Sequence, residues 1–215
     1  MLSSLSHDAR TPLTAMRAAV EALQDGMATD PDRYLDSIEH DLRAIEAIVE
    51  NLFVISKIDA DQLCLYVEEM DLVEVAAIAV GAIEPLAQKH GVLVSVESDG
   101  PVPVQAARAE TERMINNLLT NSIRHSPRDG QARVVVDAGP KPTLSVSDDG
   151  PGFDTDFVDQ AFEQFERADA ARTRAHGGAG LGLAVVRGLA EAQGGRVWAE
   201  AGPGGRVTFE LPAAV

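Results

Sequence analysis

The chain has 215 residues, of which 45% are hydrophobic and only 4% aromatic, so any core must be built from aliphatic side chains. The formal net charge of −16 argues against a nucleic-acid partner, because phosphate backbones bind basic surfaces. No apolar run approaches the roughly 20 residues of a membrane-spanning helix, and the single cysteine, Cys64, fits a reducing compartment.

Two long helices are expected at the N-terminus. Apolar residues recur at spacings of three and four in residues 1–26, with a bend expected at Pro12, which cannot donate to the carbonyl four residues back. Asp30 and Pro31 have the residue types of an N-cap and a first helical position, and they precede a second amphipathic helix over 32–60. A lone antiparallel hairpin has little core, so we expect a homodimer in which two hairpins form a four-helix bundle.

The remainder alternates strands and helices, which predicts a mixed sheet backed by helices. The fold class is therefore α+β, with one domain at 1–62 and a second at 66–215, joined by a hinge around 59–66. Helices are expected near 72–90, 108–125 and 180–194, and strands near 65–69, 92–97, 103–106, 132–138, 142–147, 196–200 and 205–211.

A glycine-containing turn follows the predicted strand at 142–147. It reads Asp148-Asp149-Gly150-Pro151-Gly152, and its two glycines allow close approach of the backbone to a ligand. A carboxylate at a strand end can accept a hydrogen bond from an amino group such as that of adenine. Taken alone, the same residues also fit an ordinary turn.

A second glycine-rich segment, Gly177 to Leu183, opens the predicted helix at 180–194. Free N–H groups and the positive end of a helix dipole form a cradle for phosphate. The segment lacks the lysine of a P-loop and does not follow a strand, so neither the Walker nor the Rossmann pattern fits. A flexible linker is the alternative, although the apolar residues within the segment make it less favoured.

Two asparagines lie one turn apart on the predicted helix at 108–125. Asn117 and Asn121 share one face, and Arg124 and His125 follow on the adjoining turn. Amide oxygens are suitable ligands for a hard cation such as Mg²⁺ that bridges phosphates. Without further context, asparagines on a helix are usually just exposed to solvent.

The first helix carries a histidine in the segment Ser6 to Leu13. Asp8 follows His7 directly and can take the imidazole N–H proton, which leaves the other ring nitrogen nucleophilic. A hydroxyl, that of Thr11, lies four residues after His7. An ordinary surface histidine is the alternative explanation.

In this order the segments resemble the sensor histidine kinases of two-component signalling, and the resemblance covers essentially the whole chain. Ser6 to Leu13 resembles the H-box of that family, with Asp8 in place of the usual glutamate, and Asn117 to His125 resembles the N-box. The first glycine box, the F-box and the second glycine box are matched by Asp148–Gly152, Phe162–Phe165 and Gly178–Leu183.

The resemblance implies an N-terminal hairpin for dimerisation and histidine phosphotransfer, followed by an α/β sandwich of the Bergerat type that binds ATP. It implies a protein histidine kinase in which His7 is the phosphoacceptor and Asp8 the base. The phosphoryl group would then pass to an aspartate on the receiver domain of a response regulator. Thr11 matches the position that orients water for dephosphorylation of the regulator, so phosphatase activity is expected as well.

The resemblance also implies an ATP site with Mg²⁺ held by Asn121 and the adenine amino group bound by Asp148. Residues 166–179 would form a lid over the nucleotide, with Arg167, Arg172 and Arg174 countering the negative net charge where the triphosphate lies. Other expected nucleotide contacts are Asn117, Arg124, His125, Gly150, Gly152, Phe165, Arg167, Gly178, Gly180, Leu181, Gly182 and Leu183.

One departure concerns the start of the chain, because only six residues precede His7. We therefore expect an excised cytoplasmic core or one part of a divided kinase. It would have no membrane contact of its own, and its parent can be anchored in the bacterial inner membrane. Three alternatives stay open: another ATPase with the same fold, a non-catalytic docking module, and an enzyme dominated by phosphatase activity. The His7 hairpin argues against the first, and the intact Asn121 and Asp148 argue against the second.

Overall fold

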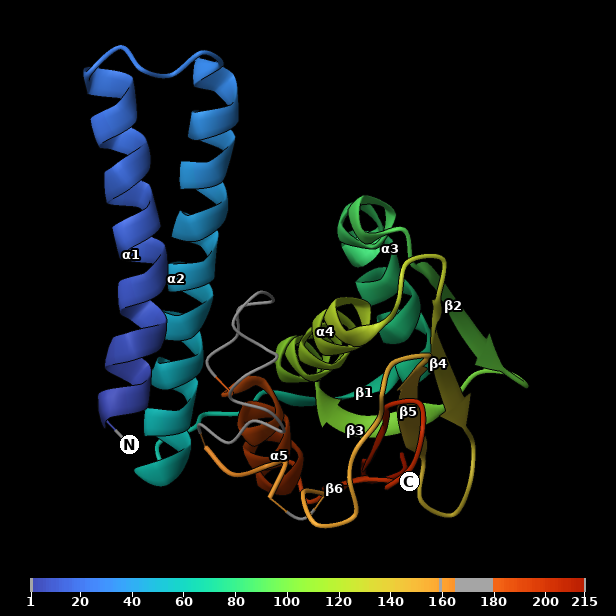
Figure 1. The fold of residues 1–215 in the computed structure, drawn as a ribbon. Coiled ribbons are helices and arrows are strands. Elements are labelled where there is room, and N and C mark those ends of the chain that lie inside the picture. Colours follow the sequence, from blue (N-terminus) through green and yellow to red (C-terminus); the bar gives the residue numbers. More distant parts are fainter. Residues whose placement is uncertain (1, 159, 165–179, 215) are drawn as a thin grey trace.

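A long helical hairpin stands beside an α/β unit in the computed structural model of the chain (Figure 1). The structure describes residues 2–158, 160–164 and 180–214, and for residues 2–9 it describes the backbone alone. This arrangement confirms the predicted fold class, a helical hairpin followed by a sheet backed by helices.

The hairpin consists of α1 (Leu2–Gln24) and α2 (Pro31–Asp59), which pack against each other in opposite directions. Asp30 caps α2 as predicted, since its side chain accepts a hydrogen bond from the backbone N–H of Arg33 at 3.4 Å. Pro12 lies within α1, which continues through it. None of the described helices is long and apolar enough to cross a membrane.

Several large hydrophobic side chains of the hairpin are exposed. Along α1 and α2, large hydrophobic side chains are exposed at positions that follow helical spacing. They are Leu13, Val20, Leu35, Leu42, Val49, Leu52 and Phe53. The hairpin therefore leaves uncovered much of the apolar surface that the sequence pattern provides.

The α/β unit is built on a five-stranded sheet with the order β2-β4-β5-β7-β6. The strand β2 is parallel to β4, and all other neighbours are antiparallel. The strands are β2 (Leu93–Ser98), β4 (Gln131–Asp137), β5 (Thr143–Asp148), β6 (Arg196–Ala199) and β7 (Arg206–Glu210). A separate antiparallel pair consists of β1 (Val67–Asp71) and β3 (Pro103–Ala107).

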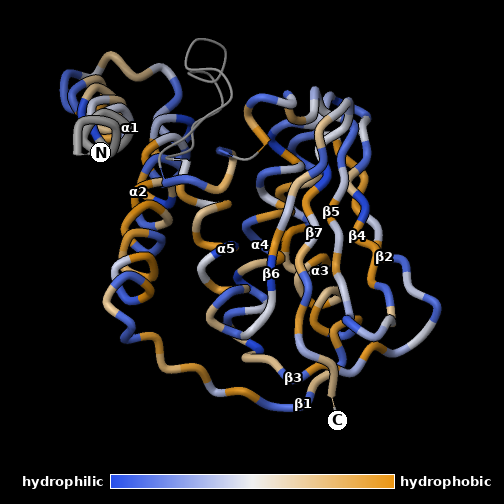
Figure 2. The backbone as a smooth tube through the Cα atoms, turned by 90° about the horizontal axis from the view of Figure 1, so that it is seen from below, coloured by the Kyte–Doolittle hydropathy of each residue, from blue (hydrophilic) through white to orange (hydrophobic). Residues whose placement is uncertain are grey.

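Three helices form a layer between the sheet and the hairpin (Figure 2). They are α3 (Leu72–His90), α4 (Arg108–His125) and α5 (Gly182–Ala192). Alternation along β4 buries Ala132, Val134 and Val136 against these helices, while the strand's charged residues stay at the surface. The core is aliphatic, as the low aromatic content requires, with Phe209 among its largest fully buried side chains.

The last two turns of α2 join this core. Val54 and Ile55 are buried in the same cluster as residues of α4 and α5, and Ile58 packs against it. The hairpin is therefore in direct contact with the helical layer of the α/β unit, and α4 and α5 lie at that contact.

Candidate functional site

Three of the predicted segments meet around α4. Asn117 and Asn121 lie on this helix, one turn apart. The start of α5 approaches α4 at Asn117, and the loop after β5 approaches its C-terminal end. Segments that are far apart in the sequence are thus brought to one helix.

The start of α5 lies close to α4 at Gly182. A Cβ atom at this position would lie 3.3 Å from Oδ1 of Asn117. The Nδ2 group of Asn117 donates a hydrogen bond to the carbonyl oxygen of Arg113 at 3.0 Å. The amide is thereby oriented with its oxygen toward the first turn of α5.

The first turn of α5 has features of an anion site. Leu181 is in the N-cap position and supplies no side-chain hydrogen bond, and no acidic residue lies in the first turn. Within the described residues, the N–H groups at the start of the helix therefore have no side-chain cap, and the positive end of the helix dipole adds to them. Leu181 is almost fully buried, Leu183 packs against the core, and Gly180 has a φ of +63°, which favours glycine.

The Asp148 carboxylate, at the end of β5, organises the loop beside α4. Its Oδ1 accepts hydrogen bonds from the backbone N–H groups of Gly150 at 2.9 Å and Gly205 at 3.1 Å. Gly205 belongs to the turn between β6 and β7, so one oxygen joins two loops. Gly205 was not among the predicted site residues, although the run Gly202-Pro203-Gly204-Gly205 is a signal for a tight turn.

The two predicted glycines of this loop are required by neighbouring backbone atoms. A Cβ at Gly150 would lie 2.7 Å from the carbonyl oxygen of His125, at the end of α4. Gly152 has a φ of +78°, and its Cβ would lie 1.8 Å from the carbonyl oxygen of Gly202. The glycines therefore allow the loop to pack against α4 and against the β6–β7 turn.

The C-terminal end of α4 carries a cation that suits an anionic ligand. Arg124 has no acidic partner in the part of the chain that the structure describes, and burial lowers the pKa of its guanidinium. An unpaired cation that has lost part of its hydration is stabilised by a bound anion. His125 follows at the surface.

Two polar groups on and after α4 fit the binding of Mg²⁺ and nucleotide. The hydroxyl of Ser126 is buried and has no hydrogen-bond partner among the described residues. The Asn121 amide makes no side-chain hydrogen bond within the described residues either, so its oxygen is available to a cation. Mg²⁺ commonly takes one or two protein ligands and completes its shell with phosphates and water.

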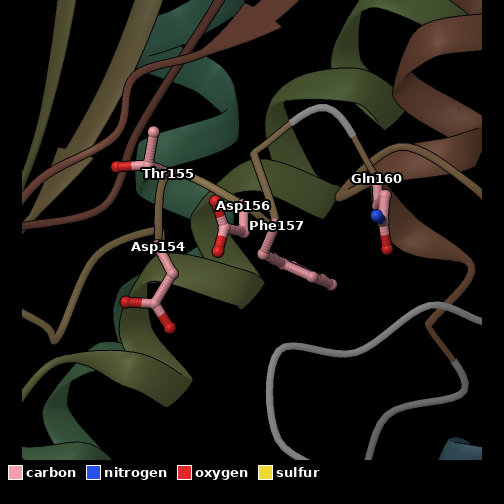
Figure 3. A pocket seen from close by; sticks show the side chains of 5 residues that line it. All are labelled: Asp154, Thr155, Asp156, Phe157 and Gln160. Carbon is pink, nitrogen blue, oxygen red and sulfur yellow. The ribbon is translucent and has the colours of Figure 1, made fainter.

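A hollow of about 630 Å³ lies next to this region and is lined by different residues (Figure 3). Asp154, Thr155, Asp156, Phe157 and Gln160 form its wall. The carboxylates of Asp154 and Asp156 would repel an anionic triphosphate. Among the described residues, none of the predicted nucleotide contacts lines this hollow, and we do not assign the nucleotide to it.

The remaining predicted residues fall into two groups. His7 and Asp8 lie on α1, where the backbone alone is described, and Thr11 is exposed on the same helix. Their catalytic roles stay predictions. Phe165, Arg167 and Gly178, together with the expected lid at 166–179, lie outside the described residues.

Two protein-family models match separate parts of the chain. Residues 106–215 match the family model of the "Histidine kinase-, DNA gyrase B-, and HSP90-like ATPase". Residues 1–61 match that of the "His Kinase A (phospho-acceptor) domain". The two matches cover the segments that carry the predicted nucleotide site and the predicted acceptor histidine.

Two curated relatives align with almost the entire chain. The sensor histidine kinase WalK of Bacillus subtilis (strain 168) is 30% identical over 98% of this chain and 36% of its own length. The signal transduction histidine-protein kinase BaeS of Escherichia coli (strain K12) is 31% identical over 98% of this chain and 46% of its own length. The chain thus spans less than half the length of these relatives.

Solved structures share the fold. The Acinetobacter baumannii histidine kinase AdeS superposes with a TM-score of 0.78 at 24% identity, covering 97% of this chain and 98% of its own. ThkA, solved in complex with the response regulator protein TrrA, gives 0.75 at 21% identity over 100% of this chain and 61% of its own. ShkA, solved full-length in complex with AMPPNP, gives 0.73 at 24% identity over 100% of this chain and 46% of its own. The chain belongs to the sensor histidine kinases, with a His Kinase A domain joined to an ATPase domain of the kind found in histidine kinases, DNA gyrase B and HSP90.

Proposed function

We propose that the chain is the catalytic core of a protein histidine kinase that uses ATP to phosphorylate His7. The observation that carries the proposal is the convergence of Asn117, Asp148 and the uncapped first turn of α5 around one helix, α4. The match of residues 1–61 to a phospho-acceptor domain supports the choice of a histidine on α1 as the acceptor.

In this proposal the nucleotide lies along α4 with its two ends bound differently. Oδ1 of Asp148 is engaged by two backbone N–H groups, and Oδ2 is left to accept a hydrogen bond from the adenine amino group. The phosphates lie at the start of α5, where the N–H groups provide positive charge, and Arg124, about two turns along α4 from Asn117, adds to it. Asn121 would hold Mg²⁺, which would neutralise part of the phosphate charge. The AMPPNP complex of ShkA supports a nucleotide site in this fold.

The chemistry assigned to the chain's own residues is a phosphoryl transfer. An imidazole nitrogen of His7 attacks the γ-phosphorus, so that a nitrogen–phosphorus bond forms while the bond to the bridging oxygen of the departing ADP breaks. Asp8 takes the proton from the other ring nitrogen. Catalysis of this kind rests mainly on positioning and charge stabilisation.

The proposed organisation has residues 1–62 as the acceptor domain and 66–215 as the ATP-binding domain, with the hinge between them. The phosphoryl group would then pass to an aspartate on a response regulator in the cytoplasm. The complex of ThkA with a response regulator supports a partner of this class. Hydrolysis of the phosphorylated regulator with help from Thr11 stays a prediction.

Autophosphorylation is the direct test of the proposal. Incubation with γ-labelled ATP and Mg²⁺ should give an acid-labile, alkali-stable label on the wild-type protein, because phosphohistidine has that stability. His7→Gln should abolish the label and leave ATP binding unchanged, since the acceptor lies on a different domain. His40→Gln is the matched control, because His40 is a histidine on the other helix of the hairpin. Label that persists in His7→Gln would refute the assignment of the acceptor.

The substitution Asp148→Asn separates loop structure from nucleotide binding. The amide oxygen can still accept from Gly150 and Gly205, but an amide NH₂ in place of Oδ2 would face the adenine amino group, which is also a donor. We expect ATP affinity, measured by calorimetry, to fall at least about ten-fold, since hydrogen bonds to charged groups contribute roughly 1.5–3 kcal/mol. The unfolding temperature without nucleotide should change little. Unchanged affinity would contradict the role of Asp148.

We also propose that the chain is a homodimer through the hairpin. The exposed apolar residues of α1 and α2 provide the surface, and the His Kinase A match supports it. Light scattering should give the dimer mass at micromolar concentrations, and Leu42→Glu should shift the protein to monomer because a charge is costly in an apolar interface. Ile78→Glu on α3 is the matched control, since Ile78 (48%) and Leu42 (47%) are equally exposed. A monomeric wild type would contradict the proposal.

A further inference from the structure

The contact between α2 and the helical layer contains a glycine on α5 and an arginine on α4 that belong neither to the nucleotide site nor to the dimer surface. We propose that Gly188 and Arg113 are positioning residues that fix the ATP-binding domain on α2 in the arrangement used for phosphorylation of His7. The inference deepens the proposed function and rests on it. Neither residue belongs to the nucleotide site or to the acceptor segment.

Gly188 lies inside α5, where glycine is less favourable than alanine for helix stability. It has no special backbone conformation, because its φ is not among the positive values. A Cβ at this position would instead lie 2.6 Å from Cδ1 and 3.2 Å from Cγ2 of Ile58 on α2. A side chain at this position would therefore displace the Ile58 side chain from its place against α5.

The buried apolar residues of α2 lie at this contact between α2 and α5. Val54 (8% exposed) and Ile55 (5% exposed) are buried in the cluster formed with the α/β unit, while five large apolar residues of α2 are exposed: Leu35, Leu42, Val49, Leu52 and Phe53. The apolar contact extends over the C-terminal part of α2, from Ile48 to Ile58. A contact of this limited extent can form and separate, as a hinge between two domains requires.

Arg113 gives the contact a defined register. Its Nη2 group lies 3.4 Å from Oδ1 of Asn51 and 3.6 Å from Oε2 of Glu50, both on α2. The Arg113 side chain is 29% exposed, and a pair of this kind adds little affinity but specifies orientation. The carbonyl of Arg113 also accepts the hydrogen bond from Asn117. Arg113, which contacts α2, therefore lies one helical turn from the proposed nucleotide site on the same helix.

The position of the contact along the hairpin relates it to His7. The helices run in opposite directions from the turn, and equal numbers of residues lead from Gln24 to His7 and from Pro31 to Ile48. With a rise of about 1.5 Å per residue, Glu50 and Asn51 lie within about one helical turn of the level of His7. The docked domain thus has the phosphate end of its site at the height of the acceptor, and such positioning is a large part of catalysis.

The kinetic test uses paired variants in the full chain. Gly188→Gln should lower the kcat of His7 labelling about five-fold or more, since small misplacements of reacting groups are costly, with KM for ATP and nucleotide affinity unchanged. Gly81→Gln is the control, because Gly81 lies inside α3 and a Cβ there meets nothing within 4 Å. Arg113→Glu should have the same effect as Gly188→Gln, and the charge exchange Arg113→Glu with Glu50→Arg should recover at least half of the lost rate.

A distance measurement provides a readout independent of activity. Spin labels are attached at Met27→Cys in the hairpin turn and at Asp137→Cys at the end of β4, in a Cys64→Ser background. Both positions are exposed, and the distance between the labels reports how the two domains are placed. The distribution of distances should broaden in Gly188→Gln and Arg113→Glu and narrow again in the charge exchange. Gly81→Gln should leave it unchanged.

The two readouts separate the inference from the proposed function. If the wild type labels His7 but neither rate nor distances change in the variants, the inference is wrong and the proposed function stands. A faster rate in Arg113→Glu also overturns the inference, because the contact would then restrain the reaction. If the wild type gives no label while the distances shift as expected, the proposed function fails, and with it the catalytic role of the docked position.

Discussion

The hydrogen bonds that Asp148 accepts from Gly150 and Gly205 hold the candidate site together. They tie the loop after β5 to the turn between β6 and β7. Gly150 in turn lies against the last carbonyl of α4, so the loop is fixed against the helix that carries Asn117 and Asn121. A carboxylate engaged by two backbone N–H groups is both rigid and oriented, which suits recognition of a ligand amino group.

Net charge imposes a second constraint on this site. A chain with a net charge of −16 can hold a triphosphate only where local positive potential exceeds the global repulsion. The uncapped start of α5 and the unpaired Arg124 provide that potential among the described residues. The neighbouring hollow lined by Asp154 and Asp156 has the opposite character. The electrostatics therefore favour one face of α4 for the phosphates.

Local structure was largely predictable from the sequence, because periodicity and capping residues determine it. The Asp30 cap and the bounds of α3 and α4 agree with prediction, and the predicted strand at 65–69 lies at Val67–Asp71. Strand order and the separate pair β1–β3 could not be derived, since pairing between distant segments depends on tertiary packing. The same holds for Gly205 and Gly188, whose functions appear only when a distant carboxylate or helix lies beside them.

We propose that the nucleotide binds along α4 between Asp148 and the start of α5. The most direct test is an NMR titration of the ¹⁵N-labelled protein with a non-hydrolysable ATP analogue and Mg²⁺. The account predicts the largest shifts in the backbone amides of Gly180, Gly182 and Gly150 and in the side-chain amide of Asn121. Shifts centred on Asp154 to Gln160 instead, with those four groups unaffected, would contradict it.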